Sequence, residues 1–224
     1  MKFKLRESIE DTESNNFDSE GNPLTREQSE FFKNSKVRDN RGRLLVCYHN
    51  SNANFDVFNK SLIKNGTFGN GFYFSTSERN VRRYGGTYTN DYYLNANRIL
   101  TIPYQYENII DYVSEKYEKV DSHQKATQII IDHGYDAIRT EMQWEDDEFD
   151  YYIVFEPNQI KSVTNKTPTN SDNINEETLV EVYPNKGESK EDFIKRFMKV
   201  TKKEYPDVKQ RLAVAYSYWN RRDK

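Results

Sequence analysis

The chain has 224 residues, enough for one globular domain with a small appendage. Its 33 basic and 36 acidic side chains nearly balance, and a net charge of −3 excludes the global basic field that draws proteins to nucleic acid or anionic membranes. No apolar run approaches the roughly 20 residues of a membrane span, and the first residues lack a secretory apolar stretch. The single cysteine, Cys47, excludes an internal disulfide framework and a multi-thiolate zinc site, so we expect a reducing compartment.

The first half of the chain predicts a leader and then alternating helices and strands. Residues 7–23 are acidic and rich in Asn and Ser, which predicts a flexible leader over 1–23. Thr25-Arg26-Glu27-Gln28 fits a capping box and predicts the start of a helix. Strands are predicted over 44–48 and 71–75, and a short helix over 77–84 ends at a pair of glycines.

The second half predicts two helices flanked by strands. In chain order, we expect a strand over 92–102, helices over 106–117 and 123–133, and strands over 135–140 and 151–155. The acidic stretch 141–148 predicts a loop between the last two strands.

The composition changes near residue 164. Residues 164–176 are rich in Asn, Thr, Ser and Pro, which predicts a linker that we extend to 186. Beyond it, apolar residues recur at helical spacing, and two short amphipathic helices cannot bury a core alone. We therefore expect the tail to pack on the first domain or on a partner. The predicted organisation is a leader over 1–23, a main domain over 24–163, a linker over 164–186 and a helical module over 187–224.

Three stretches predict the walls of one pocket: Cys47-Tyr48-His49-Asn50-Ser51, Gly69-Asn70-Gly71-Phe72-Tyr73-Phe74-Ser75 and Tyr151-Tyr152-Ile153-Val154-Phe155. His49 ends an apolar strand, where a ring nitrogen can bond a sugar hydroxyl. Tyr84 follows Tyr73 by eleven residues across the short helix. Two tyrosines can hold a cationic aromatic ring between their faces, at about 0.5–2 kcal/mol per face. The plainer interpretation is a solvent-capped histidine and two packing aromatics.

This pattern resembles the His-Tyr branch of the ADP-ribosyltransferases, which includes diphtheria toxin and the poly(ADP-ribose) polymerases. The resemblance runs from about Leu24 to Thr167, and its context looks most like the domains of this type in large phage and mobile-element proteins. It implies an α+β fold in which a split pair of small antiparallel sheets, with peripheral helices, holds NAD in the cleft between them. NAD would be the substrate, with no metal.

The resemblance also implies roles for individual residues. The histidine orients the ribose, the next backbone unit holds the carboxamide, and the two tyrosines clamp the nicotinamide. The family usually has glycine where this chain has Asn50, which tolerates unusual φ values. The residues expected to bind NAD are His49, Asn50, Ser51, Gly71, Tyr73, Tyr84 and Tyr151. Those expected to be catalytic are His49, Tyr73 and Asp150.

The third motif departs from the family. Tyr151 stands where the family has a glutamate that steadies the ribosyl cation. Strand alternation places Asp150 on the opposite face from Tyr151, so Asp150 would serve only if a β-bulge re-aimed it. Two alternatives stay open: Asp150 or Glu148 reaches the pocket, or no carboxylate occupies that place.

A competing register compares Ser75-Thr76-Ser77 and Glu148-Phe149-Asp150 with the motifs of the Arg-Ser-Glu branch. That branch has an arginine within its first strand, whereas Arg43 precedes the strand here. His49 fits the His-Tyr pattern better. Both registers imply NAD.

The acidic stretch before the third motif includes Trp144 and Glu148. In transferases of this fold the loop at this place meets the acceptor, and acidic residues suit a basic protein surface. Family members without the glutamate generally transfer single units. We therefore expect a toxin-like mono-ADP-ribosyltransferase that modifies a protein. The alternative is an inactive NAD- or ADP-ribose-binding protein, or a phage scaffold protein.

The tail resembles a short helical module at the ends of phage head proteins. The residues that carry this resemblance are 188–194, 205–207 and 210–217. It implies a phage-encoded protein, virion-associated or in the host cytoplasm, that contacts a head or portal component through residues 187–224.

Overall fold

The computed structural model describes residues 16–176, 182–202 and 207–221. It divides into two compact units, Met1–Glu176 and Glu177–Lys224. Within the described residues, no helix combines the length and apolar character that crossing a membrane requires.

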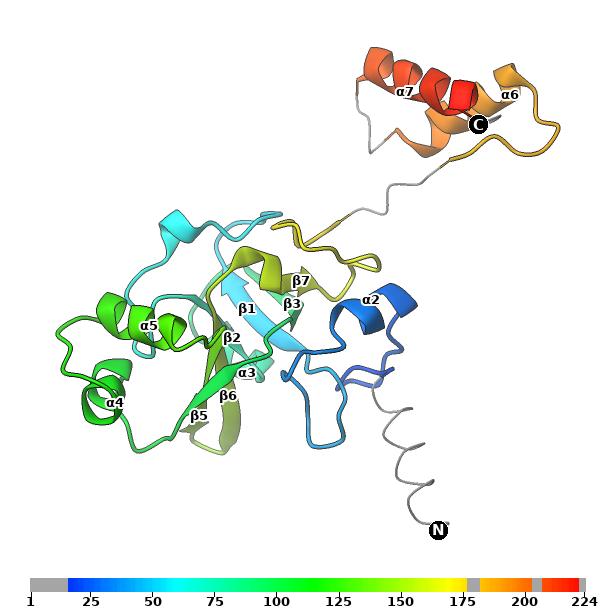
Figure 1. Ribbon diagram of the computed structural model, residues 1–224. Helices are drawn as coiled ribbons and strands as arrows, with labels where there is room; N and C mark the ends of the chain where they lie inside the picture. The colour runs from blue at the N-terminus through cyan, green and yellow to red at the C-terminus, as the bar shows by residue number, and fades with distance from the viewer. Residues whose placement is uncertain (1–15, 177–181, 203–206, 222–224) are drawn as a thin grey trace, which may run out of the picture. The chain divides into compact units, whose positions relative to one another are not determined.

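A seven-stranded sheet forms the centre of the first unit in the described part of the chain (Figure 1). Its order is β4-β5-β6-β2-β1-β3-β7, and every neighbouring pair is antiparallel except the parallel pair β4 and β5. The strands are β1 (Cys47–Ser51), β2 (Phe72–Ser75), β3 (Tyr88–Leu94), β4 (Ile99–Ile102), β5 (Ala137–Trp144), β6 (Asp147–Val154) and β7 (Ile160–Ser162).

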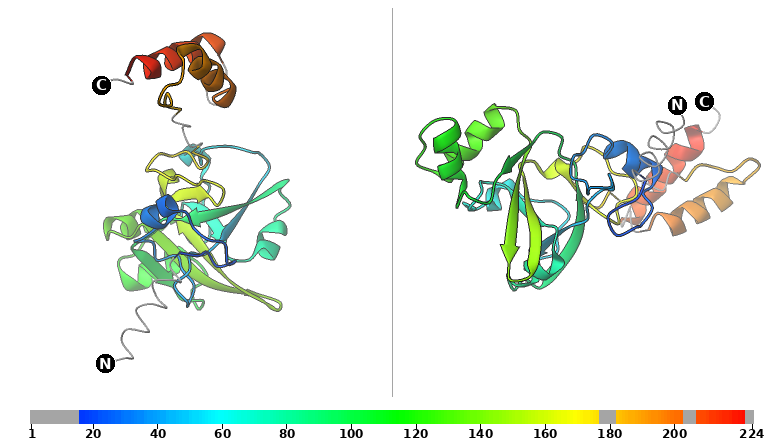
Figure 2. Two further views of the ribbon diagram at one scale, coloured as in Figure 1. Left: turned by 90° about the vertical axis from the view of Figure 1, so that its right-hand side faces the viewer. Right: turned by 90° about the horizontal axis from the view of Figure 1, so that it is seen from below.

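The helices of this unit lie around the sheet. In the described residues they are α2 (Arg26–Phe31), α3 (Glu78–Arg82), α4 (Ile109–Lys116) and α5 (His123–Asp132), with short 3-10 turns at Lys60–Leu62 and Pro157–Gln159. The capping box predicted at Thr25 is confirmed. Helices α4 and α5 pack on the half of the sheet that contains β4 to β6, whereas α2 lies at the other end, near β3 and β7 (Figures 1 and 2).

The predicted α+β fold class is confirmed, but the two expected sheets are joined into one. β1 pairs with β3 over five residues, and β2 pairs with β6 over four. Between the halves, β1 and β2 share the single register pair Tyr48 and Ser75. The strands therefore separate directly beyond Tyr48, where His49 follows.

Two predicted boundaries were wrong. The strand expected over 92–102 is interrupted between β3 and β4, because the Asp136 carboxylate accepts hydrogen bonds from the backbone N–H groups of Asn97 and Arg98. The acidic stretch 141–148 is a β-hairpin rather than a loop, since β5 and β6 pair as far as Trp144 and Asp147. Glu145 makes the turn with φ of 55°.

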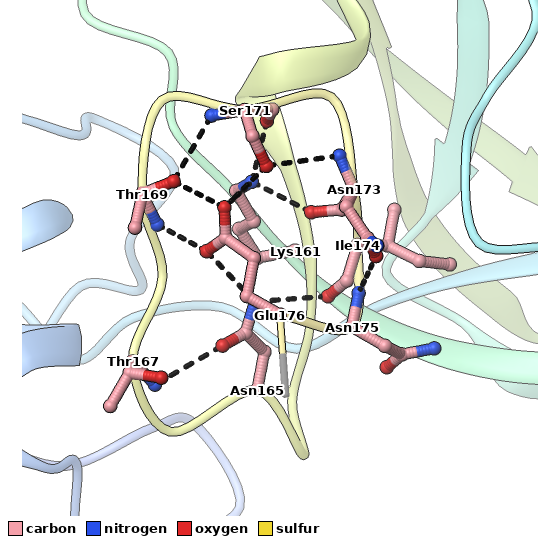
Figure 3. Close-up of polar contacts among 9 residues, drawn as sticks. All are labelled: Lys161, Asn165, Thr167, Thr169, Ser171, Asn173, Ile174, Asn175 and Glu176. Atoms are coloured by element: carbon pink, nitrogen blue, oxygen red, sulfur yellow. Dashed lines mark hydrogen bonds and ion pairs between the residues drawn. The ribbon is translucent and has the colours of Figure 1, made fainter. Parts of the chain in front are cut away.

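The segment expected to begin the linker, residues 164–176, is folded. Residues 164–176 belong to the first unit and fold around the buried ammonium of Lys161 (Figure 3). The Lys161 Nζ donates to the backbone oxygens of Ser171 and Asn173 at 2.7 and 2.8 Å, and lies 3.3 Å from Glu176. The Glu176 carboxylate also accepts from Thr169. A charged side chain that a composition argument overlooks thus holds this polar segment in place.

The expected leader falls mostly on residues 1–15, which lie outside the described residues. The part that is described is folded. Asp18 is buried, and its carboxylate accepts a hydrogen bond of 2.8 Å from the hydroxyl of Tyr93 on β3. The Ser19 N–H donates to the Leu44 carbonyl at 2.8 Å, which ties this segment to the chain before β1.

The second unit contains the two helices that the spacing predicted, α6 (Lys190–Val200) and α7 (Val208–Arg221). Ser189 caps α6 through its hydroxyl, which accepts from the Asp192 N–H. The two helices bury a small core of their own, formed by Val182, Phe193, Phe197 and Ala215. We expected these helices to need another surface to bury their apolar side chains, but the second unit buries several of them within itself.

Candidate active site

A hollow of about 460 Å³ opens where β1 and β2 separate. Its wall includes His49, Tyr73, Tyr84 and Tyr151, which the structure brings together from β1, β2, the segment after α3 and β6. Apolar side chains complete much of the wall, among them Phe68, Val81 and Met142. A largely apolar hollow with a few convergent polar groups is typical of a small-molecule site.

His49 spans the gap between the separating strands. Its Nδ1 lies 2.8 Å from the Tyr73 carbonyl oxygen, and its ring packs on Phe58 and Phe74 with centroids 5.1 and 5.4 Å apart. A carbonyl oxygen only accepts, so Nδ1 carries the proton. Burial lowers the pKa of His49, although the hydrogen bond to the Tyr73 carbonyl opposes this effect. The lowered pKa favours the neutral ring. The Nε2 of a neutral ring is then left as an acceptor.

The hydroxyl of Tyr73 is fixed by two hydrogen bonds, one accepted and one donated. The hydroxyl accepts from the Phe68 N–H at 3.0 Å and donates to the Gly69 carbonyl at 2.9 Å. Burial raises the pKa of this phenol, so it stays neutral. A Cβ on Gly66 would lie 2.5 Å or less from the ring atoms, so Gly66 leaves the space that the ring occupies. Tyr73 is therefore a fixed aromatic wall.

A chain of two hydrogen bonds joins Tyr84, Tyr151 and Asn80. The Tyr151 hydroxyl donates to Asn80 Oδ1 at 2.7 Å and lies 2.7 Å from the Tyr84 hydroxyl, which acts as the donor to it. Burial, and then the contact with Tyr84, raises the pKa of Tyr151. Tyr151 is consequently neutral and places no negative charge where the resembled family has its glutamate. The Tyr84 side chain is 73% exposed at the edge of the hollow.

Of three further residues expected to bind NAD, Asn50 lines the hollow, whereas Ser51 and Gly71 do not. Asn50 lines the hollow, but its side chain bonds Thr89 Oγ1 at 2.8 Å, and it lies in regular strand without the unusual φ that we allowed for. Ser51 donates to the Ala53 carbonyl at 2.6 Å and is not part of the wall. Gly71 is not part of it either: a Cβ there would lie 2.5 Å from Ile153, so this glycine serves the close approach of β2 and β6.

The expected carboxylates do not line this hollow. Asp150 pairs with Arg139, whose Nε lies 2.9 Å from Asp150 Oδ2, and regular β5–β6 pairing shows no bulge that re-aims it. Asp150 and Glu148 line a second hollow of about 730 Å³ on the hairpin. Met142 belongs to the walls of both. The backbone of Trp144 ends β5.

Sequence reasoning missed Glu107, which lines the first hollow from the segment before α4. Its only sequence signal is its position before Asn108, the N-cap of α4. Nothing in that signal relates it to His49. Among the described residues, no group of three or more His, Cys, Asp or Glu is arranged to hold a metal ion.

A comparison with protein families now places these residues in a known context. The family model described as "ADP-Ribosyltransferase in polyvalent proteins" matches residues 39–170. The chain belongs to this ADP-ribosyltransferase family. The matched range, more than half of the chain, contains every residue of the hollow named above. A search of curated proteins found no match.

Membership of this family confirms the resemblance to ADP-ribosyltransferases at the level of the superfamily. Domains of the family use NAD as their substrate, which makes the hollow a candidate NAD site. The assignment to the His-Tyr branch, and the resemblance of the tail to a phage module, stay predictions.

Proposed function

We propose that the chain is a mono-ADP-ribosyltransferase that transfers ADP-ribose from NAD to a protein. The observation that carries the proposal is the meeting of His49, Tyr73 and Tyr84 around one hollow of about 460 Å³. Family membership supports transfer of ADP-ribose in general. The geometry supports the finer assignment, because a neutral imidazole acceptor and two aromatic faces suit a ribose hydroxyl and a cationic pyridine ring.

Each group has a distinct part in this proposal. The Nε2 of His49 accepts from a ribose hydroxyl and orients the sugar. Tyr73, fixed through its hydroxyl, offers one aromatic face, and the exposed Tyr84 closes over the other. Cleavage of the nicotinamide–ribose bond passes through a sugar cation of oxocarbenium character. Holding the ring and the ribose in fixed positions lowers the entropic cost of reaching that state.

The second hollow is the proposed place of the acceptor. It adjoins the first through Met142, and three carboxylates line it, those of Glu141, Glu148 and Asp150, against one cation, Arg139. An acidic wall repels phosphates and suits a basic protein segment. The hairpin position of Trp144 and Glu148 agrees with the acceptor role that we expected for them. We propose single-unit transfer because Tyr151 is neutral at the glutamate position, and family members without that glutamate generally transfer single units.

The test is incubation of the protein with labelled NAD and a bacterial lysate. We expect label on a protein band, and we expect His49→Ala to abolish it. His133→Ala is the matched control, because His133 is an exposed histidine that bonds the Ile129 carbonyl and lies outside the hollow. Absence of both transfer and NAD hydrolysis by the wild type would refute the proposal.

The neutral Tyr151 favours a second candidate, a protein that binds NAD or ADP-ribose without turnover or serves as a scaffold. Calorimetry combined with an assay for nicotinamide separates the two candidates. A binding protein gives a heat of NAD binding but releases no nicotinamide. For the second unit we propose contact with a phage head or portal component, which would make the protein phage-encoded and place it in the virion or the host cytoplasm. The amphipathic helices α6 and α7 support an interaction role for that unit.

A further inference from the structure

The proposed reaction creates positive charge on the ribose, and such charge needs a preorganised negative partner. The phenol of Tyr151 is neutral, and Asp150 is paired with Arg139 at the other hollow. Among the described residues that line the first hollow, Glu107 is the one acidic side chain, and neither Lys nor Arg is among them. The wall therefore carries one negative charge that no cation of the same wall balances.

The backbone of Glu107 is fixed on both sides. Before it, Tyr106 is buried, donates its N–H to the Pro103 carbonyl at 3.1 Å and packs edge-on against Tyr112 with ring centroids 5.0 Å apart. After it, Ile109 is fully buried and donates its N–H to the Thr67 carbonyl at 3.0 Å. Glu107 is thus a carboxylate on an anchored segment.

The same segment that anchors Glu107 also positions Tyr73. Thr67 accepts from Ile109, and the next residue, Phe68, donates its N–H to the Tyr73 hydroxyl. Glu107 and Tyr73 are therefore tied to one short piece of chain. The backbone that carries the Glu107 carboxylate is thus held in register with the nicotinamide wall, beside the place where charge develops on the ribose.

The carboxylate is also available. Among the described residues, Glu107 forms neither an ion pair nor a hydrogen bond through its side chain, whereas Asp150 and Glu141 both contact Arg139. A carboxylate without such a partner is free to contact a cationic ligand. The nicotinamide ring of NAD and the ribosyl cation are both cations.

We propose that Glu107 supplies the negative charge that the resembled family obtains from its glutamate, an inference that rests on the proposed function. The bond between ribose C1′ and the nicotinamide nitrogen breaks, and both electrons stay with nicotinamide, which becomes neutral. The positive charge passes to the ribose, where Glu107 stabilises it. The acceptor's nitrogen or oxygen then bonds C1′ and loses its proton to Glu107, which releases it to solvent.

The test compares Glu107→Gln with wild type in two measurements, the Kd of NAD by calorimetry and the rate of nicotinamide release. We expect the rate to fall about 100-fold or more, as for removal of one charge-stabilising group, while the Kd changes about threefold at most. The amide keeps the size of the side chain, and Glu107 is exposed, so the fold should be unaffected. Glu118→Gln is the matched control, because Glu118 is exposed, follows α4 and does not line the hollow.

Three outcomes overturn the inference. Turnover by Glu107→Gln within about threefold of wild type rejects Glu107 and leaves the proposed transferase intact. An equal loss of binding and turnover assigns Glu107 to binding alone and also rejects the catalytic role. A wild-type protein that binds NAD but releases no nicotinamide rejects both the role of Glu107 and the proposed function. In that case His49→Ala has no activity to remove.

Discussion

The His49 imidazole bonds the Tyr73 carbonyl through Nδ1 and offers Nε2 to a ligand. Protonation would convert Nε2 from an acceptor to a donor and would place a cation beside the cationic nicotinamide. Both effects weaken NAD binding. Because burial lowers the pKa of His49, the neutral ring persists to a lower pH than in an exposed histidine.

We therefore expect the affinity for NAD to stay level from about pH 8 down to 6.5, the ordinary imidazole pKa, and to decline only below it. The measurement is the calorimetric Kd of NAD across this range. His49→Gln is the control: its side chain does not titrate, so its affinity, although lower, should show no such decline. A decline centred above pH 6.5 would contradict the assigned pKa direction.

At the residue scale, sequence reasoning found the groups with a motif and missed the group without one. His49, Tyr73 and Tyr84 follow from spacing along short neighbouring elements, and all three line the hollow. Ser51 and Gly71 share the same motifs but do not line it, because strand geometry turns one away and packs the other against β6. The one local signal of Glu107, its position before the N-cap Asn108, does not relate it to His49, since its place depends on the bond between Ile109 and Thr67.

At the element scale, the segment 164–176 depends on one buried ion pair. Lys161 is fully buried, and it supplies the donors for two backbone carbonyls and for Glu176. Burial lowers the pKa of Lys161, against the raising effect of Glu176, and hydrogen bonds from Ser171 and Thr169 help to lower that of Glu176. The segment is therefore an extension of the sheet domain rather than a free linker.

We expect Lys161→Met to lower the free energy of unfolding by about 3–5 kcal/mol, because it leaves the Glu176 carboxylate without its cation. Denaturant unfolding measures the change. The matched control is Lys60→Met, which breaks an exposed pair with Glu156 and should cost about 1 kcal/mol or less. Equal losses in the two variants would show that Lys161 does not organise the segment.

The helix starts that the sequence predicted well are those fixed by hydrogen bonds between residues close in the chain. The caps at Thr25, Ser77 and Ser122 are bonds between near neighbours, so the sequence displays them. The break between β3 and β4 comes from Asp136, far along the chain, and composition cannot show it. The β5–β6 hairpin was missed because its acidic residues resemble a solvated loop, whereas cross-strand pairing decides its conformation.

At the scale of the whole molecule, the two units have separate cores. The sheet domain is complete at Glu176, and the second unit packs Phe193 and Phe197 against α7. Separate cores allow the two proposed activities, transfer of ADP-ribose and contact with a phage component, to be lost independently.

We expect a chain that ends at Glu176 to fold and to bind NAD within about twofold of the full-length affinity. The same truncation should abolish retention of the partner that the second unit binds. Calorimetry measures the first expectation and co-sedimentation with phage particles the second. Unfolding of the truncated chain would show instead that the second unit is needed for the stability of the first.

The sequence by itself determined the family, the α+β class and the histidine and tyrosines of the hollow, because these depend on residue type and on spacing within single elements. The tertiary structure decided that one seven-stranded sheet nearly divides between β1 and β2, that Tyr151 is engaged by Asn80 and Tyr84, and that Glu107 is the acidic residue of the wall. These features arise from hydrogen bonds and packing between segments that are distant in the chain, and no local pattern encodes such contacts.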